Sequence, residues 1–437
     1  MRILHWNALN ESERRAALER PVQQARADIE ALVREIIAAV RVRGDAALRE
    51  YTRRFDQTEL ETLRVSASEF AAAHSALDAD QRAALERAIE NVERFHRTQD
   101  LSSVSLETVP GVRCERIYRP IEAVGLYVPA GSAPLPSAVV MLAIPARIAG
   151  CPQRVLCTPP DRSGRAHPAV LLAAQLCGIE QVFKIGGAQA IAALAYGTES
   201  LPKVDKIFGP GNAWVTAAKQ IVATDPLGAA CDMPAGPSEV MVIADADADP
   251  NFVAADLLAQ AEHDPRAQAL LVTPSAALAQ AVAAAVERQA ATLSRRAILE
   301  HSLRASRALV VADLESAVAV ANAYAAEHLI LEVREPRALL KHIINAGSVF
   351  LGAWSPEPMG DYCSGTNHVL PTYGYARAYS GLGVLDYLKR ITVQELTPDG
   401  LRALGPTAVT LARLEGLDAH AAAVTCRLQA LAAGSPS

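Results

Sequence analysis

The sequence lacks the features that mark membrane proteins and nucleic-acid-binding proteins. Its longest apolar run, AVVMLAIPA, is far too short to cross a bilayer, and its first stretch, MRILHWNALNESERRAAL, becomes charged too early for a secretory signal. Its formal net charge of -6 offers no basic field to DNA or RNA. We therefore expect a cytoplasmic protein with no membrane partner and no nucleic-acid partner.

The cysteine pattern excludes two further classes. The chain has 7 cysteines, an odd number, spread from Cys114 to Cys426 without any C-x-x-C spacing. Such a pattern is typical neither of a disulfide framework nor of a zinc cluster held by thiolates. We expect reduced and mostly buried thiols.

What the sequence does contain predicts an α/β protein. Residues 14–98 have the apolar spacing of helices, whereas from Val124 onward short apolar runs alternate with Gly/Pro turns and Ala-rich helices, which predicts parallel βαβ units. A first series of strands is expected at VGLYVP, RVLCTPP, QVFKIGG and VDKIFGPG. A second series is expected at EVMVIAD, QALLVTP, RALVVAD, HLILEV and GSVFLG. The tail from Val384 is predicted to be mostly helical, with helices around Gly416.

Glycine-rich turns follow two of the expected strands. The G-x-G-x-x-G fingerprint is absent after every strand, so the Rossmann character is incomplete. IGGAQA (185–190) and GPGNAW (209–214) place glycines where a strand leads into a helix, a position at which free N–H groups attract phosphate. Glycine also serves backbone geometry there, so both interpretations stay open. Because ligands of open parallel sheets bind beyond the carboxyl ends of the strands, we expect the site at those ends.

Histidines are the most informative polar residues. Of the 10, six lie in regions with no other convergent polar group: His5, His74, His96, His167, His301 and His342. The other four are His263, His328, His368 and His420, and each has an oxygen-bearing neighbour, in order Gln260, Glu327, Asp361 and Glu415. Nitrogen and oxygen donors of this kind suit a divalent metal such as zinc.

Simpler interpretations of the same residues remain. The polar end of LLAQAEHDP is also what a helix closed by Pro265 would show, and His328 would suit a helix C-terminus through the helix dipole. Spacing along the chain cannot show whether these residues converge in space.

Three long stretches resemble the histidinol dehydrogenase family. They are CDMPAGPSEVMVIADADADPNFVAADLLAQAEHD, then GSVFLGAWSPEPMGDYCSGTNHVLPTYGYARAYSGLG with KRITVQEL, and AVGLYVPAGSAPLPSAVVMLAIPARIAGC. The resemblance covers nearly the whole chain and is weakest in the first hundred residues. Ala130 stands where a second glycine is expected and Ala138 replaces a threonine, which affects the nucleotide site more than any ligand.

The resemblance implies a homodimeric zinc enzyme that oxidises L-histidinol to L-histidine with NAD, through histidinal and its hydrate, in the last steps of histidine biosynthesis. The implied catalytic residues are Glu327 and His328, with His328 accepting the hydroxyl proton and Glu327 activating water. The implied zinc ligands are Gln260, His263, Asp361 and His420. The implied substrate contacts are Ser238, Gln260, His263, His328, Asp361, His368, Glu415 and His420. The implied NAD contacts are Tyr127, Gln189 and Asn212.

The expected domains follow from these assignments. Residues 24–125 and 238–380 are expected to form a discontinuous α/β domain with the metal and catalytic residues, and residues 126–237 an α/β domain that contacts NAD. Residues 1–23 and 381–437 are expected to form a helical dimerisation arm whose tail reaches the partner's site. The alternatives are a zinc and NAD dehydrogenase of another amino alcohol or polyol, a zinc hydrolase, and a catalytically silent binding protein.

Overall fold

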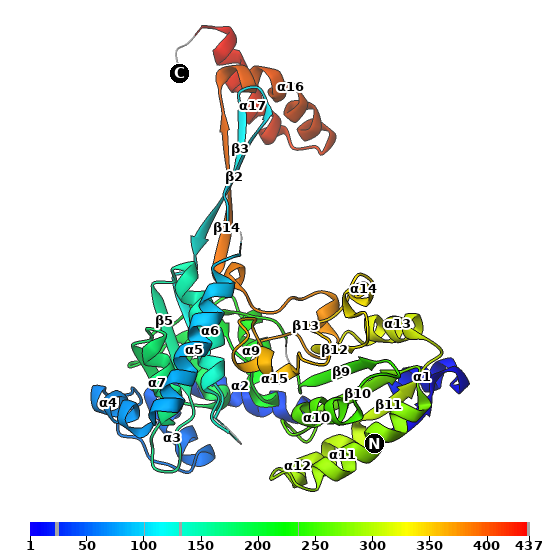
Figure 1. Ribbon diagram of the computed structural model, residues 1–437. Coiled ribbons are helices and arrows are strands. Elements are labelled where there is room, and N and C mark those ends of the chain that lie inside the picture. Colours follow the sequence, from blue (N-terminus) through cyan, green and yellow to red (C-terminus); the bar gives the residue numbers. More distant parts are fainter. Residues whose placement is uncertain (22–25, 100, 131–132, 235, 435–437) are drawn as a thin grey trace. The chain divides into compact units, whose positions relative to one another are not determined.

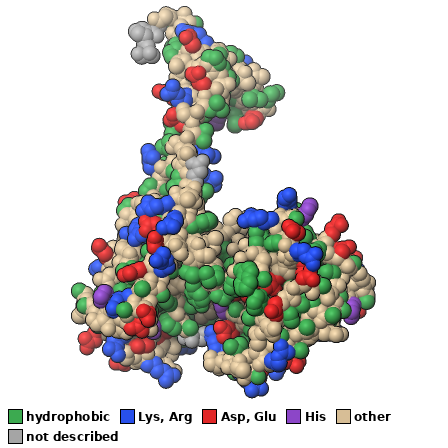
Figure 2. Space-filling model, in the orientation of Figure 1, with side chains coloured by type: hydrophobic (Ala, Val, Ile, Leu, Met, Phe, Trp, Pro, Cys, Tyr) green, Lys and Arg blue, Asp and Glu red, His purple; other side chains and the backbone are tan. Residues whose placement is uncertain are grey.

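The computed structural model describes residues 1–21, 26–99, 101–130, 133–234 and 236–434. The chain divides into two units (Figure 1): Met1–Thr98 with Ile121–Tyr387, and Gln99–Pro120 with Leu388–Ser437. No cysteine forms a disulfide, as the sequence predicts, but only three of the seven thiols are buried, which are Cys151, Cys157 and Cys177, so the expectation of mostly buried thiols was wrong. Within the described ranges, no helix combines the length and apolarity needed to cross a bilayer. Figure 2 shows acidic and basic side chains interspersed over the visible face of the first unit.

The first unit contains a six-stranded parallel sheet. Its strands, in spatial order, are β1 (Arg2–His5), β11 (Arg307–Val310), β10 (Gln268–Thr273), β9 (Glu239–Ala244), β12 (His328–Glu332) and β13 (Ser348–Leu351). Every residue of β9 is buried, because its alternate side chains enter two different cores. Helices α10 (Pro250–Ala261), α11 (Ala276–Ala290) and α12 (Arg296–Ala305) cover one face, and α13 (Leu314–Tyr324) covers the other.

A second parallel sheet in the same unit has five strands. Their order is β6 (Gln181–Lys184), β5 (Gln153–Thr158), β4 (Ala123–Tyr127), β7 (Lys206–Phe208) and β8 (Ala230–Cys231). One face packs against α4 (Ala67–Ala76), α5 (Ala79–His96), α6 (Pro136–Ala149) and α7 (Pro168–Leu176). The other face packs against α2 (Arg26–Arg43), α3 (Asp45–Phe55), α8 (Gly187–Tyr196) and α9 (Ala213–Thr224).

All nine predicted strands are present, which confirms the α/β prediction. The expected domain boundaries need two corrections. Helices α2 to α5 belong with the five-stranded sheet and not with the sheet that carries the catalytic candidates, because their apolar faces share cores with α6 and α8. The N-terminal segment is not wholly helical, since β1 pairs in parallel with β11 and forms the edge of the six-stranded sheet.

The second unit combines an antiparallel sheet with a helical hairpin. Its strands are β2 (Val104–Val109), β3 (Val112–Pro120) and β14 (Leu388–Leu396), and its helices are α16 (Pro398–Leu414) and α17 (Asp418–Ala432). The helices flank Gly416, which has a left-handed φ of 71°, as predicted. The expectation of helix directly after Val384 was wrong for β14, because LKRITVQEL alternates along an exposed strand that pairs with β3 over its whole length.

A proline inside α6 determines how the loop with His368 is held. Pro145 has no N–H to donate, so the carbonyl of Met141, four residues earlier, lacks its usual helical partner. Asn367 supplies one, since its Nδ2 donates to Met141 O at 2.8 Å while its Oδ1 accepts from Val369 N–H at 2.9 Å. The amide of Asn367 therefore satisfies the helix and fixes the loop residue next to His368.

The substitution Asn367→Ala is expected to lower the free energy of unfolding by about 1–3 kcal/mol, because it leaves the buried carbonyl of Met141 unsatisfied. The loss should be smaller when Pro145→Ala restores a helical N–H. Denaturant unfolding of both single variants and the double variant measures this coupling. If Asn367→Ala lowers the free energy of unfolding equally with Pro145 and with Ala at position 145, then Asn367 does not stabilise the protein through the Met141 carbonyl.

Candidate active site

The predicted catalytic pair lies at the amino ends of two central strands. His328 is the first residue of β12, Glu327 precedes it, and Glu239 begins the neighbouring β9. Gln260 is near the end of α10, which follows β9 and returns across the sheet to the same edge. These candidates therefore lie at the amino edge of this sheet and not at the carboxyl ends, where we expected the site, because they come from residues that enter the strands.

The imidazole of His328 is held at one nitrogen and open at the other. Its Nδ1 lies 2.8 Å from Gln260 Oε1 and 3.3 Å from Glu239 O. Both are acceptor oxygens, so they favour a proton on Nδ1. The Nε2 atom is buried without a hydrogen-bond partner and faces Asp361 Oδ1 at 3.5 Å.

Carboxylates surround this histidine. Glu327 Oε2 and Glu357 Oε1 each lie 3.8 Å from Nδ1. Burial on its own would lower the pKa of His328, but the charges of Glu327, Asp361 and Glu357 raise it to about 10. Burial also raises the pKa of Glu327 to about 8, although its carboxylate accepts a hydrogen bond from Glu239 N–H at 2.8 Å. The two candidate catalytic groups therefore both have pKa values raised well above their ordinary ones.

The donors for a metal ion come together beside His328. Ligand atoms of His263, Glu357 and Asp361 all lie within 4.8 Å of one another. Glu357 and Asp361 are four residues apart on α15 (Glu357–Tyr362) and so share a face. Glu357 is 1% exposed, and neither of its oxygens has a hydrogen-bond partner. This nitrogen and oxygen donor set fits a divalent cation such as zinc.

Glu357 was missed from the sequence. Its only signal was the spacing of four to Asp361 in EPMGD, which sequence reasoning interpreted as part of an irregular loop. The predicted ligands His263 and Asp361 do come together, and Gln260 reaches the same place through its contact with His328.

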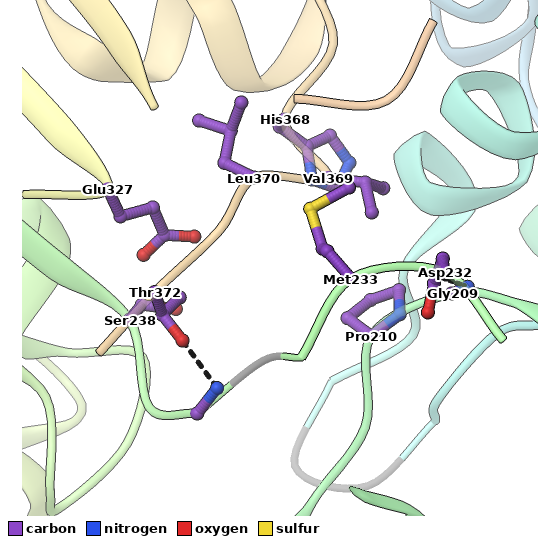
Figure 3. A pocket seen from close by; sticks show the side chains of 11 residues that line it. Gly209, Pro210, Asp232, Met233, Ser238, Glu327, His368, Val369, Leu370 and Thr372 are labelled. Atoms are coloured by element: carbon purple, nitrogen blue, oxygen red, sulfur yellow. Dashed lines mark hydrogen bonds between the residues drawn. The ribbon is translucent and has the colours of Figure 1, made fainter. Parts of the chain in front are cut away.

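A small pocket opens next to Glu327. Its volume is about 50 Å³, and it is lined on one side by Ser238, Glu327 and Thr372 and on the other by Gly209, Pro210 and Met233 (Figure 3). His368 also lines it, with a buried Nε2 that has no hydrogen-bond partner. The pocket thus brings the amino edge of the six-stranded sheet to the turn that follows β7 in the five-stranded sheet.

The predicted NAD contacts lie at the carboxyl edge of the five-stranded sheet. The hydroxyl of Tyr127 accepts the N–H of Gly187 at 3.1 Å, and Gln189 is 1% exposed in the first turn of α8. Asn212 caps α9, where its Oδ1 accepts two backbone N–H groups at 3.1 Å. All three therefore shape the glycine turns that the sequence identified.

The turn at Gly209 is clamped by a buried ion pair. Lys219 and Asp232 pair with each other, Lys219 Nζ donates to Gly209 O at 2.9 Å, and Gly209 N–H donates to Asp232 Oδ2 at 2.7 Å. Gly209 has φ +124°, and a Cβ there would meet Tyr127 O at 2.1 Å. A second cavity of about 160 Å³ adjoins the first and shares Gly209, Asp232 and Met233 with it.

The two predicted tail residues belong to the second unit. Glu415 is the C-cap residue directly after α16, and His420 lies in the first turn of α17. They are on either side of Gly416, and both side chains are exposed. They lie at the same end of the helical hairpin.

Comparisons with known proteins agree with the resemblance over the full chain. The sequence model of the family described as histidinol dehydrogenase matches residues 18–428. The histidinol dehydrogenase of Yersinia pestis is 55% identical over 429 residues, which cover 98% of this chain and 96% of that protein. That of Vibrio cholerae is 54% identical over 431 residues and 99% of each chain. The crystal structure of histidinol dehydrogenase from Elizabethkingia anophelis superposes with a TM-score of 0.95 at 46% identity, covering 99% of this chain and 98% of that one.

The carboxyl edge of the six-stranded sheet holds a different feature, a pair of buried acids. Glu332, the last residue of β12, is 3% exposed, and neither of its oxygens has a hydrogen-bond partner. Asp256 on α10 is 6% exposed. Burial raises the pKa of each carboxyl to about 7.

Glu332→Gln is expected to raise the free energy of unfolding at pH 8.5, which is roughly one and a half units above the raised pKa of Glu332. Near pH 5 we expect no such gain over the unaltered chain. The folded state keeps the Glu332 proton up to about pH 7, whereas an unfolded glutamate releases it near the ordinary value of 4.5, so rising pH between these values favours unfolding. The gain should be on the order of a few kcal/mol, since each pKa unit corresponds to about 1.4 kcal/mol. Thermal unfolding at both pH values, with the exposed Glu335→Gln as control, tests this; a gain that is equal at both pH values would contradict it.

Proposed function

The chain belongs to the histidinol dehydrogenase family and oxidises histidinol in histidine biosynthesis, and we propose that it does so with a zinc ion and NAD, in two successive hydride transfers from one carbon. The observation that carries this proposal is the buried pair Glu327–His328, in which one imidazole nitrogen is fixed and the other is open beside a set of metal donors. Histidinal and its hydrate would be the intermediates.

Gln260, His263 and Asp361 would hold the zinc from the first unit, and His420 would complete the site. The donor set fits zinc, because it offers imidazole and oxygen ligands beside buried polar atoms that have no partner. Zinc would bind the substrate's amine and imidazole nitrogens and so orient the reacting carbon. Glu357 stands close enough to influence the same ligands.

His328 would act as the base in both oxidations. Its Nδ1 proton is fixed by Gln260 Oε1 and Glu239 O, so Nε2 is the nitrogen that would accept the substrate's hydroxyl proton as hydride leaves for NAD. Asp361 and Glu327 stabilise the cation that forms when His328 takes up this proton. Because they also raise its pKa to about 10, the reaction would start from the neutral form of the imidazole, which becomes more populated as the pH rises. The same nitrogen would deprotonate the aldehyde hydrate before the second hydride transfer.

Glu327 would activate the water that hydrates the aldehyde between the two oxidations. Its carboxyl lines the pocket, and burial brings its pKa to about 8, close to the range in which a carboxylate can take a proton from attacking water. The hydrogen bond from Glu239 N–H orients the carboxylate. Water adds to the aldehyde carbon and Glu327 receives the proton.

The remaining assignments follow the family. Ser238, His368 and Glu415 would contact the substrate, and Tyr127, Gln189 and Asn212 would contact NAD. We propose a homodimer in which Glu415 and His420 from one tail serve the partner's site. Seven free cysteines fit a reducing compartment, which supports a cytoplasmic location.

The yield of NADH from limiting L-histidinol tests the four-electron reaction. We expect a yield near two per histidinol with zinc present, since two hydrides leave the same carbon, and loss of activity after chelation that added zinc restores. A yield near one would remove the hydration step assigned to Glu327. Failure to form any NADH would leave a different amino alcohol or a zinc hydrolase to be tested.

Glu327→Gln is expected to slow overall oxidation by about 10²–10⁴-fold, because the amide cannot accept a proton from water. Bound zinc, measured by metal analysis, should stay at the level of the unaltered enzyme, since Glu327 is not among the proposed ligands. Glu300→Gln on the exposed face of α12 is the control. Loss of zinc together with activity would assign Glu327 to the metal site instead.

A further inference from the structure

Glu239 holds both catalytic candidates through its main chain. Its N–H donates to Glu327 Oε2 at 2.8 Å, and its carbonyl oxygen lies 3.3 Å from His328 Nδ1. One peptide residue at the start of β9 therefore orients the acid and the base together. A small displacement of Glu239 would move both.

The side chain of Glu239 is fixed from two directions. Arg20 donates through Nε to Oε1 at 2.5 Å and through Nη2 to Oε2 at 2.8 Å, which is a bidentate contact. The N–H of Tyr373 also donates to Oε1, at 2.6 Å. Glu239 is 2% exposed and the Arg20 side chain 13%, so the pair is shielded from water.

Arg20 reaches Glu239 from a distant and well-anchored part of the chain. Its Nη2 also donates to Tyr324 O at 2.8 Å, and its guanidinium carbon lies 3.9 Å from the centre of the Tyr324 ring. Tyr324 ends α13, three residues before Glu327. The Tyr324 hydroxyl donates to Gln268 Oε1 at 2.7 Å, and Gln268 Nε2 donates to Glu19 O at 3.1 Å. Arg20 thus joins the start of β9 to the segment that delivers the catalytic pair.

We propose that Arg20 and Glu239 are positioning residues for the Glu327–His328 pair, which rests on the catalytic roles proposed above. Stability alone does not require this arrangement, because a buried ion pair is often no more stabilising than well-packed apolar side chains. A planar guanidinium with two parallel hydrogen bonds fixes direction as well as distance, and a lysine cannot reproduce this. The third hydrogen bond, from Tyr373 N–H, ties the adjacent pocket residue Thr372 to the same carboxylate.

The test compares Arg20→Ala, Arg20→Lys and Glu239→Gln in the full-length, zinc-loaded enzyme. Displacement of catalytic groups predicts that kcat falls about 10²-fold in Arg20→Ala, a size expected for misplacement by about 1 Å. KM for histidinol and NAD should change by less than about three-fold, because no substrate contact is removed. The kcat of Arg20→Lys should lie between the values of the unaltered enzyme and Arg20→Ala. Glu239→Gln should lose activity, because an NH₂ group then faces one of the Arg20 donors.

Two further measurements separate positioning from folding. Added guanidinium ion should restore part of the kcat of Arg20→Ala and none of the kcat of Arg20→Lys, and zinc content should be unchanged in both. Arg15→Ala, in the same N-terminal segment but with an exposed salt bridge to Glu11, is the matched control and should keep full activity. The double variant Arg20→Ala/Glu239→Gln should be no slower than the more affected single variant, because both changes break one interaction.

The possible failures are distinguishable. An unaltered enzyme that forms no NADH from histidinol overturns the proposed function, whereas an active one in which folded Arg20→Ala keeps its kcat overturns the positioning role. Reduced thermal stability with normal kcat per folded molecule would also overturn it, since that is the result of a merely structural pair. If Arg20→Ala does not fold, the kcat of Arg20→Lys is the deciding measurement, and a normal kcat in that variant refutes the proposal.

Discussion

Burial of one imidazole among three carboxylates is the constraint on which the arrangement of the site depends. His328 is 3% exposed, and Glu327, Glu357 and Asp361 all lie within 3.8 Å of its ring nitrogens. Buried charges of one sign are costly unless a partner offsets them, and His328 is the one group of these four that can carry a positive charge. Neither oxygen of Glu357 has a hydrogen-bond partner, and burial raises the pKa of its carboxyl well above the ordinary value. The proposed divalent cation beside Asp361 would offset the carboxylate charge, so the proposed metal site and the geometry around His328 depend on each other.

The two sheets of the first unit contribute opposite ends of their strands. In the five-stranded sheet, the turns that follow β4, β6 and β7 carry the nucleotide candidates, in agreement with the general behaviour of open parallel sheets. In the six-stranded sheet, the catalytic candidates precede the strands, and the carboxyl edge holds the buried pair Glu332 and Asp256 instead. The pocket between Glu327 and Gly209 is where these two edges meet.

The sequence predicted most of the fold but only part of the site. Continuous apolar runs identified nine of the eleven strands of the two parallel sheets, because strands buried on both faces leave a clear signal, whereas the short edge strands β1 and β8 were not predicted. β14 was missed because an exposed, alternating strand carries almost no burial signal of its own. The assignment of His263 and Asp361 as ligands came from a resemblance, and their proximity could not be inferred from two positions 98 residues apart. Glu357 escaped both routes, since its role depends on a short helix inside a segment without periodicity.

Arg20 shows why a site extends beyond its motifs. It lies 219 residues from Glu239, in the region where the family resemblance is weakest, and nothing in its local sequence marks it. The contacts that orient Glu327 and His328 use the main chain of Glu239, so almost any residue there could supply them. The Glu239 side chain, in contrast, is held by the two hydrogen bonds from the Arg20 guanidinium. These two bonds in turn fix the position of the Glu239 main chain. The side chains of Arg20 and Glu239 are therefore required to orient the two contacts that the Glu239 main chain makes with the catalytic pair. The sequence alone cannot show this requirement, because it arises from the packing of the N-terminal segment against β9 and α13.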